Sequence, residues 1–342
     1  MRSNRIYIVF FILSAILLVG LLLVDLYIGN AKISWMELWD IILLRSTANE
    51  MNSTIVWDIR IPRLWTACIV GATLSVAGLQ MQTIFRNPLA GPYILGVSSG
   101  ASLGVAILVL GVGSSWYHFV GSGIGSWSIA AAAWIGAGIV LAFVLYVSSR
   151  VRGVMTVLVL GILFSGVATS IVNLLQYFGS KAALKSFVVW TMGSIGAATS
   201  SQLIVMSMVS LLGVAISFVM SKRLDAFMLG ERYALSLGVH LKWTRALIFL
   251  STTMIAGTVT AFCGPIGFIG VAIPHISRMI LSSASHKFLI PASMILGAIF
   301  LVLGDIISQV PGYSLVLPIN SVMSLLGIPI VVWVILNKRV IN

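Results

Sequence analysis

Residues 86–104 read RNPLAGPYILGVSSGASLG, a run dense in Gly, Pro, Ser and Asn that lies between two long apolar stretches. Gly and Pro interrupt a helix and free backbone N–H and C=O groups, and lipid offers those groups no hydrogen bonds. A broken backbone at membrane depth must therefore be buried in protein or line a water-filled passage. We predict that this run is a gate or re-entrant segment of a transport pathway.

The composition indicates a membrane protein built from helices. Of the 342 residues, 59% are hydrophobic and only 8% are charged, whereas soluble domains carry about 25% charged residues. The mean hydropathy is +1.11. No segment is long and polar enough for a separate soluble domain, so we predict a single all-α, polytopic transmembrane domain over residues 1–342.

Ten segments approach the length of about 20 mostly apolar residues that a membrane span needs. The first follows Arg2 and Arg5 and is expected to stay as a span, because no small-residue cleavage site follows it. The eighth is short and carries Pro274, so it is expected to be broken or partly re-entrant. The predicted spans are 6–29, 63–83, 93–112, 128–148, 153–175, 201–220, 243–262, 266–282, 289–308 and 315–336.

The distribution of charge orients these spans. With the N-terminus inside, fourteen of the 20 Lys and Arg residues fall on the cytoplasmic side, so the positive-inside rule predicts that both termini are cytoplasmic. The basic residues lie at span ends, as the positive-inside rule predicts. Membrane topology therefore accounts for the net charge of +12, which argues against nucleic acid as a partner. The six outer cations are Lys32, Arg45, Arg60, Arg63, Lys181 and Lys185.

Two short amphipathic helices are predicted on the outer side. Residues 34–44 begin with Ser34, and Glu37 follows three residues later, which is a capping-box pattern. Residues 181–192 form the second.

Arg60 and Arg63 also lie on the outer side, three residues apart, so they share one face of a helix that Pro62 is expected to start. Two interpretations are open. The pair either snorkels at the membrane interface or anchors an acidic partner outside the membrane.

Residues 221–245 form the longest polar stretch on the cytoplasmic side. The stretch is too polar to span the membrane and is long enough for two short helices around Gly230 and Gly238. We expect Asp225 and Glu231 to face water or a partner. The stretch is either an ordinary solvated loop or a docking element for a cytoplasmic motor protein.

Catalytic and metal-binding signals are few. The sequence contains no G-x-x-x-x-G-K-[ST] phosphate loop and no H-E-x-x-H. His275 is one of only four histidines, and none of them lies at ligand spacing to another, so a packed or capping role is favoured over metal ligation. We expect a transport subunit that is not an enzyme, with no catalytic residues, no metal and no cofactor.

Four blocks of the sequence, in order, resemble the membrane subunit of FecCD-type ABC importers, a family that takes up iron–siderophore complexes, haem and cobalamin. The resemblance covers residues 58–339, nearly the whole chain. The blocks are RNPLAGPYILGVSSGASLG, LGERYALSLGVHLKWTR, GPIGFIGVAIPHISR and LPINSVMSLLGIPIVVWVI.

This resemblance implies a type II ABC importer permease with ten spans in the bacterial cytoplasmic (inner) membrane. It implies a homodimer with a second permease copy, two cytoplasmic ATPase subunits on which ATP and Mg²⁺ act, and an extracytoplasmic substrate-binding protein. It also assigns three sites. The gate residues are Asn87, Leu89, Gly91 and Pro92; the ATPase-coupling residues are Leu229, Gly230, Glu231 and Gly238; the binding-protein docking residues are Arg60 and Arg63.

The chain departs from the family pattern at three places. Val154-Met155-Thr156 opens the fifth predicted span, where some relatives contribute a small polar gate pair. Gln309 stands where a third basic docking residue is common, and Ser285-His286-Lys287 replaces a common DHR.

Two other classes of function compete with the importer. Asp25 and Asp305 lie near span ends and motivate an ion-gradient-driven secondary transporter, although such carriers usually place charged groups at the membrane midplane. A polytopic membrane enzyme is motivated only by His275 and scattered polar groups.

Overall fold

The structure is a computed structural model of the chain, and it describes residues 2–29, 31–44, 50–111, 123–151, 153–309 and 316–336. These residues form helices and loops, with no strand among them. The predicted outer cation Arg45 lies outside the described residues. The α-helices are α1 Arg2–Tyr27, α2 Trp35–Leu44, α3 Glu50–Thr54, α4 Ile61–Phe85, α5 Val97–Ala106, α7 Gly123–Arg150, α8 Val154–Phe178, α9 Lys181–Thr191, α10 Ser200–Val219, α11 Ser221–Met228, α12 Glu231–Ser236, α13 Leu241–Cys263, α14 Ile269–Leu281, α15 His286–Ser308 and α16 Ile319–Leu336, and the π-helices are η1 Ile55–Arg60 and η2 Ile107–Gly111.

Within the described residues, seven helices are long and apolar enough to cross a membrane, and three shorter apolar helices accompany them at residues 97–111, 269–281 and 319–333. The ten correspond one to one with the ten predicted segments. Most edges agree within a few residues, but the second helical stretch begins at Glu50, well before the predicted residue 63. The number of crossings and the side of the termini stay predictions.

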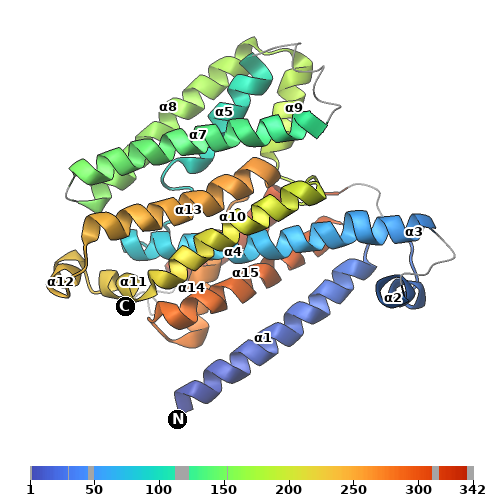
Figure 1. Cartoon of the computed structure of the whole chain (residues 1–342), viewed down its shortest axis with the longest axis horizontal. Coiled ribbons are helices and arrows are strands. Elements are labelled where there is room, and N and C mark those ends of the chain that lie inside the picture. The colour runs from blue at the N-terminus through green and yellow to red at the C-terminus, as the bar shows by residue number, and fades with distance from the viewer. Residues whose placement is uncertain are drawn as a thin grey trace.

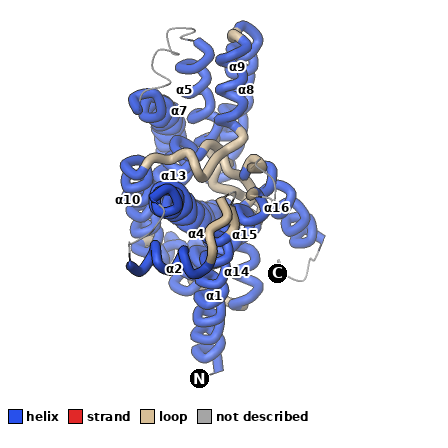
Figure 2. Tube along the Cα trace, turned by 90° about the vertical axis from the view of Figure 1, so that its right-hand side faces the viewer, coloured by secondary structure: helices blue, strands red, loops and turns tan. Residues whose placement is uncertain are grey.

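Helix α4 lies at the centre of the bundle, packed against α10, α13, α14 and α15 (Figure 1). Glycines let it approach its neighbours closely, as small residues do in membrane bundles. A Cβ atom on Gly71 would lie 2.2 Å from the Gly297 carbonyl oxygen of α15, and one on Gly78 would lie 1.7 Å from the Gly270 carbonyl oxygen of α14. A second group, formed by α5, α7, α8 and α9, joins this centre through contacts between α7 and α13 (Figures 1 and 2).

Pro62 lies in the first turn of α4, as expected, but α4 follows another helical segment directly. The chain is helical from Glu50 to Phe85, and Pro62 follows the wider π-helical turn η1. Proline has no N–H and clashes with the carbonyl four residues earlier in an α-helix, so a π turn immediately before it relieves that clash without ending the helix.

The two predicted amphipathic segments are helices α2 and α9. The Oγ of Ser34 accepts the Glu37 N–H at 3.3 Å, which is one half of the predicted capping box. The Glu37 carboxylate instead accepts a hydrogen bond from Asn52 Nδ2 at 2.6 Å, so it ties α2 to α3.

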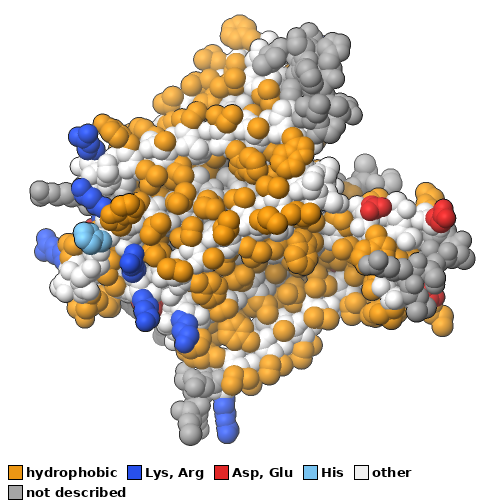
Figure 3. All heavy atoms as spheres, viewed as in Figure 1, with side chains coloured by type: hydrophobic (Ala, Val, Ile, Leu, Met, Phe, Trp, Pro, Cys, Tyr) orange, Lys and Arg blue, Asp and Glu red, His pale blue; other side chains and the backbone are white. Residues whose placement is uncertain are grey.

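Charged side chains separate along the molecule as the sequence predicted. In the face drawn in Figure 3, Lys and Arg gather at the end where α11 and α12 lie, and Asp and Glu gather at the end where α2 and α3 lie. We refer to these as the basic end and the acidic end. The positive-inside rule places the basic end in the cytoplasm.

Candidate gate, coupling and docking sites

The predicted gate segment begins as a tight turn at the end of α4. Arg86 adopts a left-handed conformation with φ 48°, which ends the helix. The Asn87 side-chain oxygen then accepts the Leu89 N–H at 2.9 Å, and the Ala90 N–H donates to the Asn87 carbonyl at 3.1 Å. These bonds satisfy backbone groups that lipid could not, so the NPLA turn is stable where the helix is broken. The side chain of Leu89 is 43% exposed.

The rest of the gate segment is buried against two helices. Pro92 packs on Gly270 of α14, where an added Cβ would lie 2.4 Å from Pro92 Cδ. Gly91 faces Val271, and Gly96, with φ 82°, approaches the Gly161 carbonyl of α8. The expectation of an irregular backbone is confirmed for residues 86–96, of which Ala90, Pro92, Leu95 and Gly96 are buried in protein and Arg86 and Leu89 are exposed. It is wrong for residues 97–104, which are helical, because the break ends at the left-handed Gly96.

Ser98 stands in Gly96-Val97-Ser98-Ser99-Gly100, which has the G-x-S-x-G spacing of a hydrolase nucleophile elbow. That elbow requires a strand before the helix, and a loop precedes α5. The hydroxyl groups of Ser98, Ser99 and Ser102 instead line a polar cavity of about 230 Å³ between α5, α8 and α9.

A chain of polar contacts joins the coupling segment to the gate at the basic end. The Asp225 carboxylate on α11 accepts the His286 N–H at 2.8 Å and lies 2.6 Å from His286 Nδ1. Nε2 of His286 lies 2.8 Å from Thr83 Oγ1, and Arg278 Nη2 donates to the same hydroxyl at 3.1 Å. Arg278 Nη1 also donates to Gln82 Oε1 at 2.7 Å. Helices α11, α15, α4 and α14 are therefore fixed to one another within one turn of the gate.

The negative charge of Asp225 determines which nitrogen of His286 carries a proton in this series of hydrogen bonds. Partial burial raises the pKa of the Asp225 carboxyl, but hydrogen bonds from His286 and Ser285 outweigh it, so that pKa lies below its ordinary value of 3.8. An ionised carboxylate accepts only, so His286 Nδ1 must carry a proton. If His286 is neutral, Thr83 donates its hydroxyl proton to Nε2; if His286 is charged, Thr83 donates to the Leu79 carbonyl, which lies 2.9 Å away.

The coupling segment folds as two short helices, α11 and α12, that break at Gly230 and Gly238 with φ of 108° and 78°. Both glycines adopt conformations that side-chain-bearing residues rarely take. Glu231 was expected to face water or a partner. It instead pairs with Arg245 at 2.5 Å, and this guanidinium is only 2% exposed. The ion pair fixes α12 to the start of α13.

Apolar side chains of the coupling segment point outward at the basic end. Grooves of about 1050 Å³ and 1020 Å³ flank α12, and Glu231 lines both. Exposed apolar side chains on and beside the short helix α12 are typical of an interaction site, and we call them together the apolar patch. The patch consists of Leu229, Tyr233, Leu235, Leu237 and Trp243, each more than half exposed.

Arg60 and Arg63 are not two free outer cations. Arg60 is 8% exposed, and its guanidinium donates to the carbonyls of Leu26, Tyr27 and Ala31, the last at 2.6 Å. A cation favours the C-terminal carbonyls of a helix, so Arg60 caps α1. Arg60 is therefore not an outward-facing docking residue, and Arg63 is the one residue of the predicted pair that is still a candidate.

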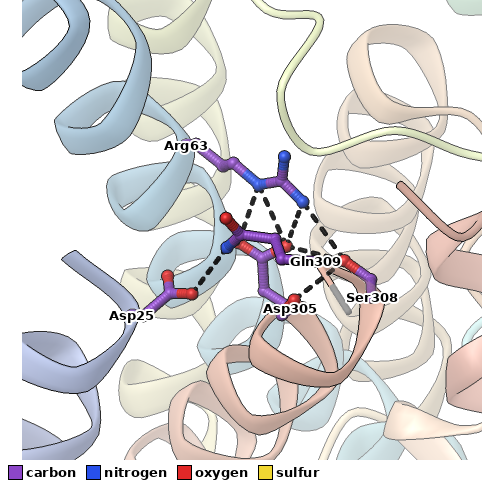
Figure 4. A network of polar contacts seen from close by, with 5 residues as sticks. All are labelled: Asp25, Arg63, Asp305, Ser308 and Gln309. Carbon is purple, nitrogen blue, oxygen red and sulfur yellow. Dashed lines mark hydrogen bonds and ion pairs between the residues drawn. The ribbon is translucent and has the colours of Figure 1, made fainter. Parts of the chain in front are cut away.

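Arg63 belongs to the polar network at the acidic end of the bundle (Figure 4). Its Nε lies 3.0 and 2.9 Å from the two carboxylate oxygens of Asp305, and its Nη2 donates to Ser308 Oγ at 3.1 Å. Gln309 Nε2 donates to Asp25 Oδ1 at 2.7 Å, which connects α1 to the end of α15. Gln309 stands where a third basic docking residue is common in the family. It carries no charge that could neutralise Asp25, but it donates a hydrogen bond to this buried carboxyl group.

A family comparison explains this combination of gate, coupling segment and outer network. The model of the FecCD transport family matches residues 16–337. The chain belongs to the FecCD transport family. It is a permease of the ABC importer type and a membrane protein.

Individual relatives agree over almost the whole length. The hemin transport system permease protein HmuU of Yersinia pestis is 32% identical, over 93% of this chain and 94% of that protein. The molybdate import system permease protein MolB of Haemophilus influenzae is 33% identical, over 92% of this chain and 91% of that protein. A solved structure described as an inward-facing conformation of a metal-chelate type ABC transporter superposes with a TM-score of 0.81 at 27% identity, covering 98% of this chain and 99% of that one.

Sequence reasoning missed two functional neighbourhoods. Gln80 is fully buried and bonds to Ser217, Ser251 and Thr252, which joins α4 to α10 and α13. The Asp225–His286 pair was missed as well. Its partners are 61 residues apart in the sequence, so no spacing rule could have found it.

Proposed function

We propose that this chain is the membrane-spanning subunit of an ATP-driven importer that moves an iron complex, haem or cobalamin into the bacterial cytoplasm. A binding protein outside the membrane delivers the cargo, and two ATPase subunits bind at the basic end. The chain itself holds no cofactor, and ATP and Mg²⁺ act on the ATPase. The observation that carries this proposal is the exposed apolar patch of the coupling segment, joined by Asp225 and His286 to the gate.

A second copy of the chain fits the exposed face of α8. The apolar side chains of Met155, Val159, Leu163 and Val167 are each more than half exposed. These residues are spaced four apart, so they lie on one face of α8, and the rest of the described chain does not cover that face. We propose a homodimer in which the two α8 helices flank the passage.

The identity of the cargo is the most specific part of the proposal. The names of two relatives of nearly equal identity specify different cargo, hemin and molybdate. Overall identity therefore does not select a cargo for this chain, and a passage that must release its cargo has little reason to bind it tightly.

Uptake into proteoliposomes tests the function. The vesicles contain this chain, its ATPase and its binding protein, and the panel is a ferric siderophore, haem, cobalamin and molybdate. We expect uptake of one of them only with ATP and with the binding protein. Full uptake without the ATPase would overturn the proposal, and uptake that follows an ion gradient and survives ATP depletion would establish the secondary transporter instead.

A substitution in the patch tests the coupling role. Leu235→Asp places a charge in the apolar patch and should lower ATPase binding and transport together, with Leu235→Met as the matched control. A variant that folds, transports normally and binds the ATPase normally would contradict the assignment.

The docking role of Arg63 needs a variant that keeps the internal ion pair. Arg63→Glu combined with Asp305→Arg retains a pair inside the protein but reverses the sign of the outward group. We expect weaker docking of an acidic binding protein, and the loss should shrink as salt rises. Unchanged affinity at low salt would count against docking through Arg63.

A further inference from the structure

A cavity of about 260 Å³ lies at the basic end, between the last turn of α4, the gate turn and α14. A water molecule takes about 30 Å³ of liquid, so this volume corresponds to about nine waters and holds a tetrahedral oxyanion together with some of its water. Met228 of the coupling segment borders the cavity, and no Asp or Glu lines it. Its polar wall is Gln82, Thr83, Arg86, Asn87, His275 and Arg278.

The positive charge around this cavity has no counter-charge within the described part of the chain. Arg278 donates to Gln82 Oε1 and to Thr83 Oγ1, and both of these oxygens are neutral. The three ion pairs among the described residues use other side chains. Arg86 approaches the cavity from the opposite side, with its guanidinium beside Gly230. Arg278 is half-buried and Arg86 is exposed, so two guanidinium groups border one small cavity. A partly buried charge is stabilised by a partner of opposite sign.

The donors of the wall that can face the cavity are few. Gln82 Nε2 donates one hydrogen bond to the Val271 carbonyl at 2.9 Å. The Asn87 oxygen accepts the Leu89 N–H, which leaves its NH₂ group to donate. His275 is 4% exposed, and its Nε2 and the Nε of Arg278 are buried and have no partner. The Asn87 amide and the terminal guanidinium nitrogens are therefore the donors that an acceptor in the cavity would meet.

We propose that this cavity binds a small tetrahedral oxyanion such as inorganic phosphate. The anion neutralises Arg278 and Arg86 and accepts hydrogen bonds from their guanidinium groups and from the Asn87 amide. Oxyanions suit guanidinium groups because each N–H can donate to a separate oxygen. The bound anion would join the gate turn to α14 beside the coupling segment and stabilise the gate in the conformation seen here. The proposal concerns the charge of this cavity and holds whatever cargo the protein carries.

Thermal unfolding of the purified full-length chain in lipid nanodiscs tests the site. Phosphate is titrated against chloride at constant ionic strength in the low millimolar range, where the general stabilising effect of phosphate on proteins is small. We expect the unfolding midpoint to rise with phosphate and to saturate, as it does when a ligand binds only the folded state. Arg278→Gln should raise the half-saturating concentration about tenfold or more, because it removes a charge-assisted contact. Arg150→Gln, at the same end but outside this cavity, is the matched control and should respond like the wild type.

A second variant keeps the test decisive if Arg278→Gln fails to fold. Asn87→Asp preserves the acceptor for the Leu89 N–H and places a carboxylate in the cavity. It should raise the midpoint without phosphate and abolish the response to phosphate. The proposal is overturned if the wild type shows no phosphate response beyond that to chloride, or if Asn87→Asp responds to phosphate like the wild type. The proposal is also overturned if phosphate raises the unfolding midpoint of the chain alone but not that of its complex with the ATPase. That result would indicate that a carboxylate of the ATPase occupies the cavity.

Discussion

The crossing of α4 and α14 at Gly78 gives a sharp test of how the bundle is held together. Replacing Gly78 by Ala would place a Cβ atom 1.7 Å from the Gly270 carbonyl oxygen, where ordinary contact begins near 3.4 Å. The obstacle is backbone and not a flexible side chain, so the two helices must separate by about 1.7 Å at this point. A gap of 0.5 to 1 Å already forfeits about a quarter to a half of a dispersion contact.

The cost of Gly78→Ala should therefore reach the upper end of what overpacking costs, about 3 kcal/mol. For a chain of 342 residues that corresponds to a fall in the unfolding midpoint of about 4 °C. Transport should fall too, because Pro92 of the gate segment packs on the same Gly270. The assay is the apparent midpoint from intrinsic tryptophan fluorescence in nanodiscs at one fixed scan rate.

Gly138→Ala is the matched control. Gly138 lies inside α7, and a Cβ there would meet nothing within 4 Å. Alanine favours a helix over glycine by about 0.5–1 kcal/mol, so the midpoint should stay or rise slightly. If Gly78→Ala unfolds within about 1 °C of the wild type, α4 and α14 do not meet as the structure shows, and the reasoning fails.

Three further predictions use the polar networks. Asp305→Asn removes the carboxylate that pairs with the Arg63 guanidinium and should cost about 3 kcal/mol, and adding Arg63→Gln should recover most of it in a double-mutant cycle. Because the pKa of Asp225 is depressed in the folded protein, its stabilisation is present above its ordinary pKa of 3.8 and is lost as pH falls through the lower, folded value. The difference in midpoint between wild type and Asp225→Asn should accordingly be constant near neutral pH and shrink only in strong acid. Gln80→Leu should cost about 1–3 kcal/mol by leaving three buried hydroxyl groups with fewer partners, whereas a midpoint equal to that of the wild type would show that water replaces the amide.

The sequence predicted the apolar helices well because their signal is local. Twenty apolar residues form a span whatever they contact, and clustered glycine and proline interrupt it, so a break was predicted at residues 86–104, of which 86–96 are irregular. The fate of charged side chains was predicted poorly. Arg60 and Glu231 were expected to be available to partners, but each is bound within the chain by groups far away in sequence. Which acceptor a guanidinium reaches depends on how helices pack, and pattern and spacing carry no information about that.

The networks at the two ends of α4 limit what a partner can move. At the acidic end Arg63 fixes α4 to α15, and at the basic end Thr83 and Gln82 fix it to α15 and α14. The glycine crossings lie between these two ends, so α4, α14 and α15 form one packed unit. The gate turn continues directly from α4, and Asp225 attaches the coupling segment to the same unit through His286. A partner shifts a two-state equilibrium only through contacts that differ between the states. A motor that binds the coupling segment is therefore expected to act first on this unit as a whole. The joint that we expect to yield is the left-handed Gly96, where the gate segment meets α5 and lies beside Gly161, Phe164 and Ser165 of α8.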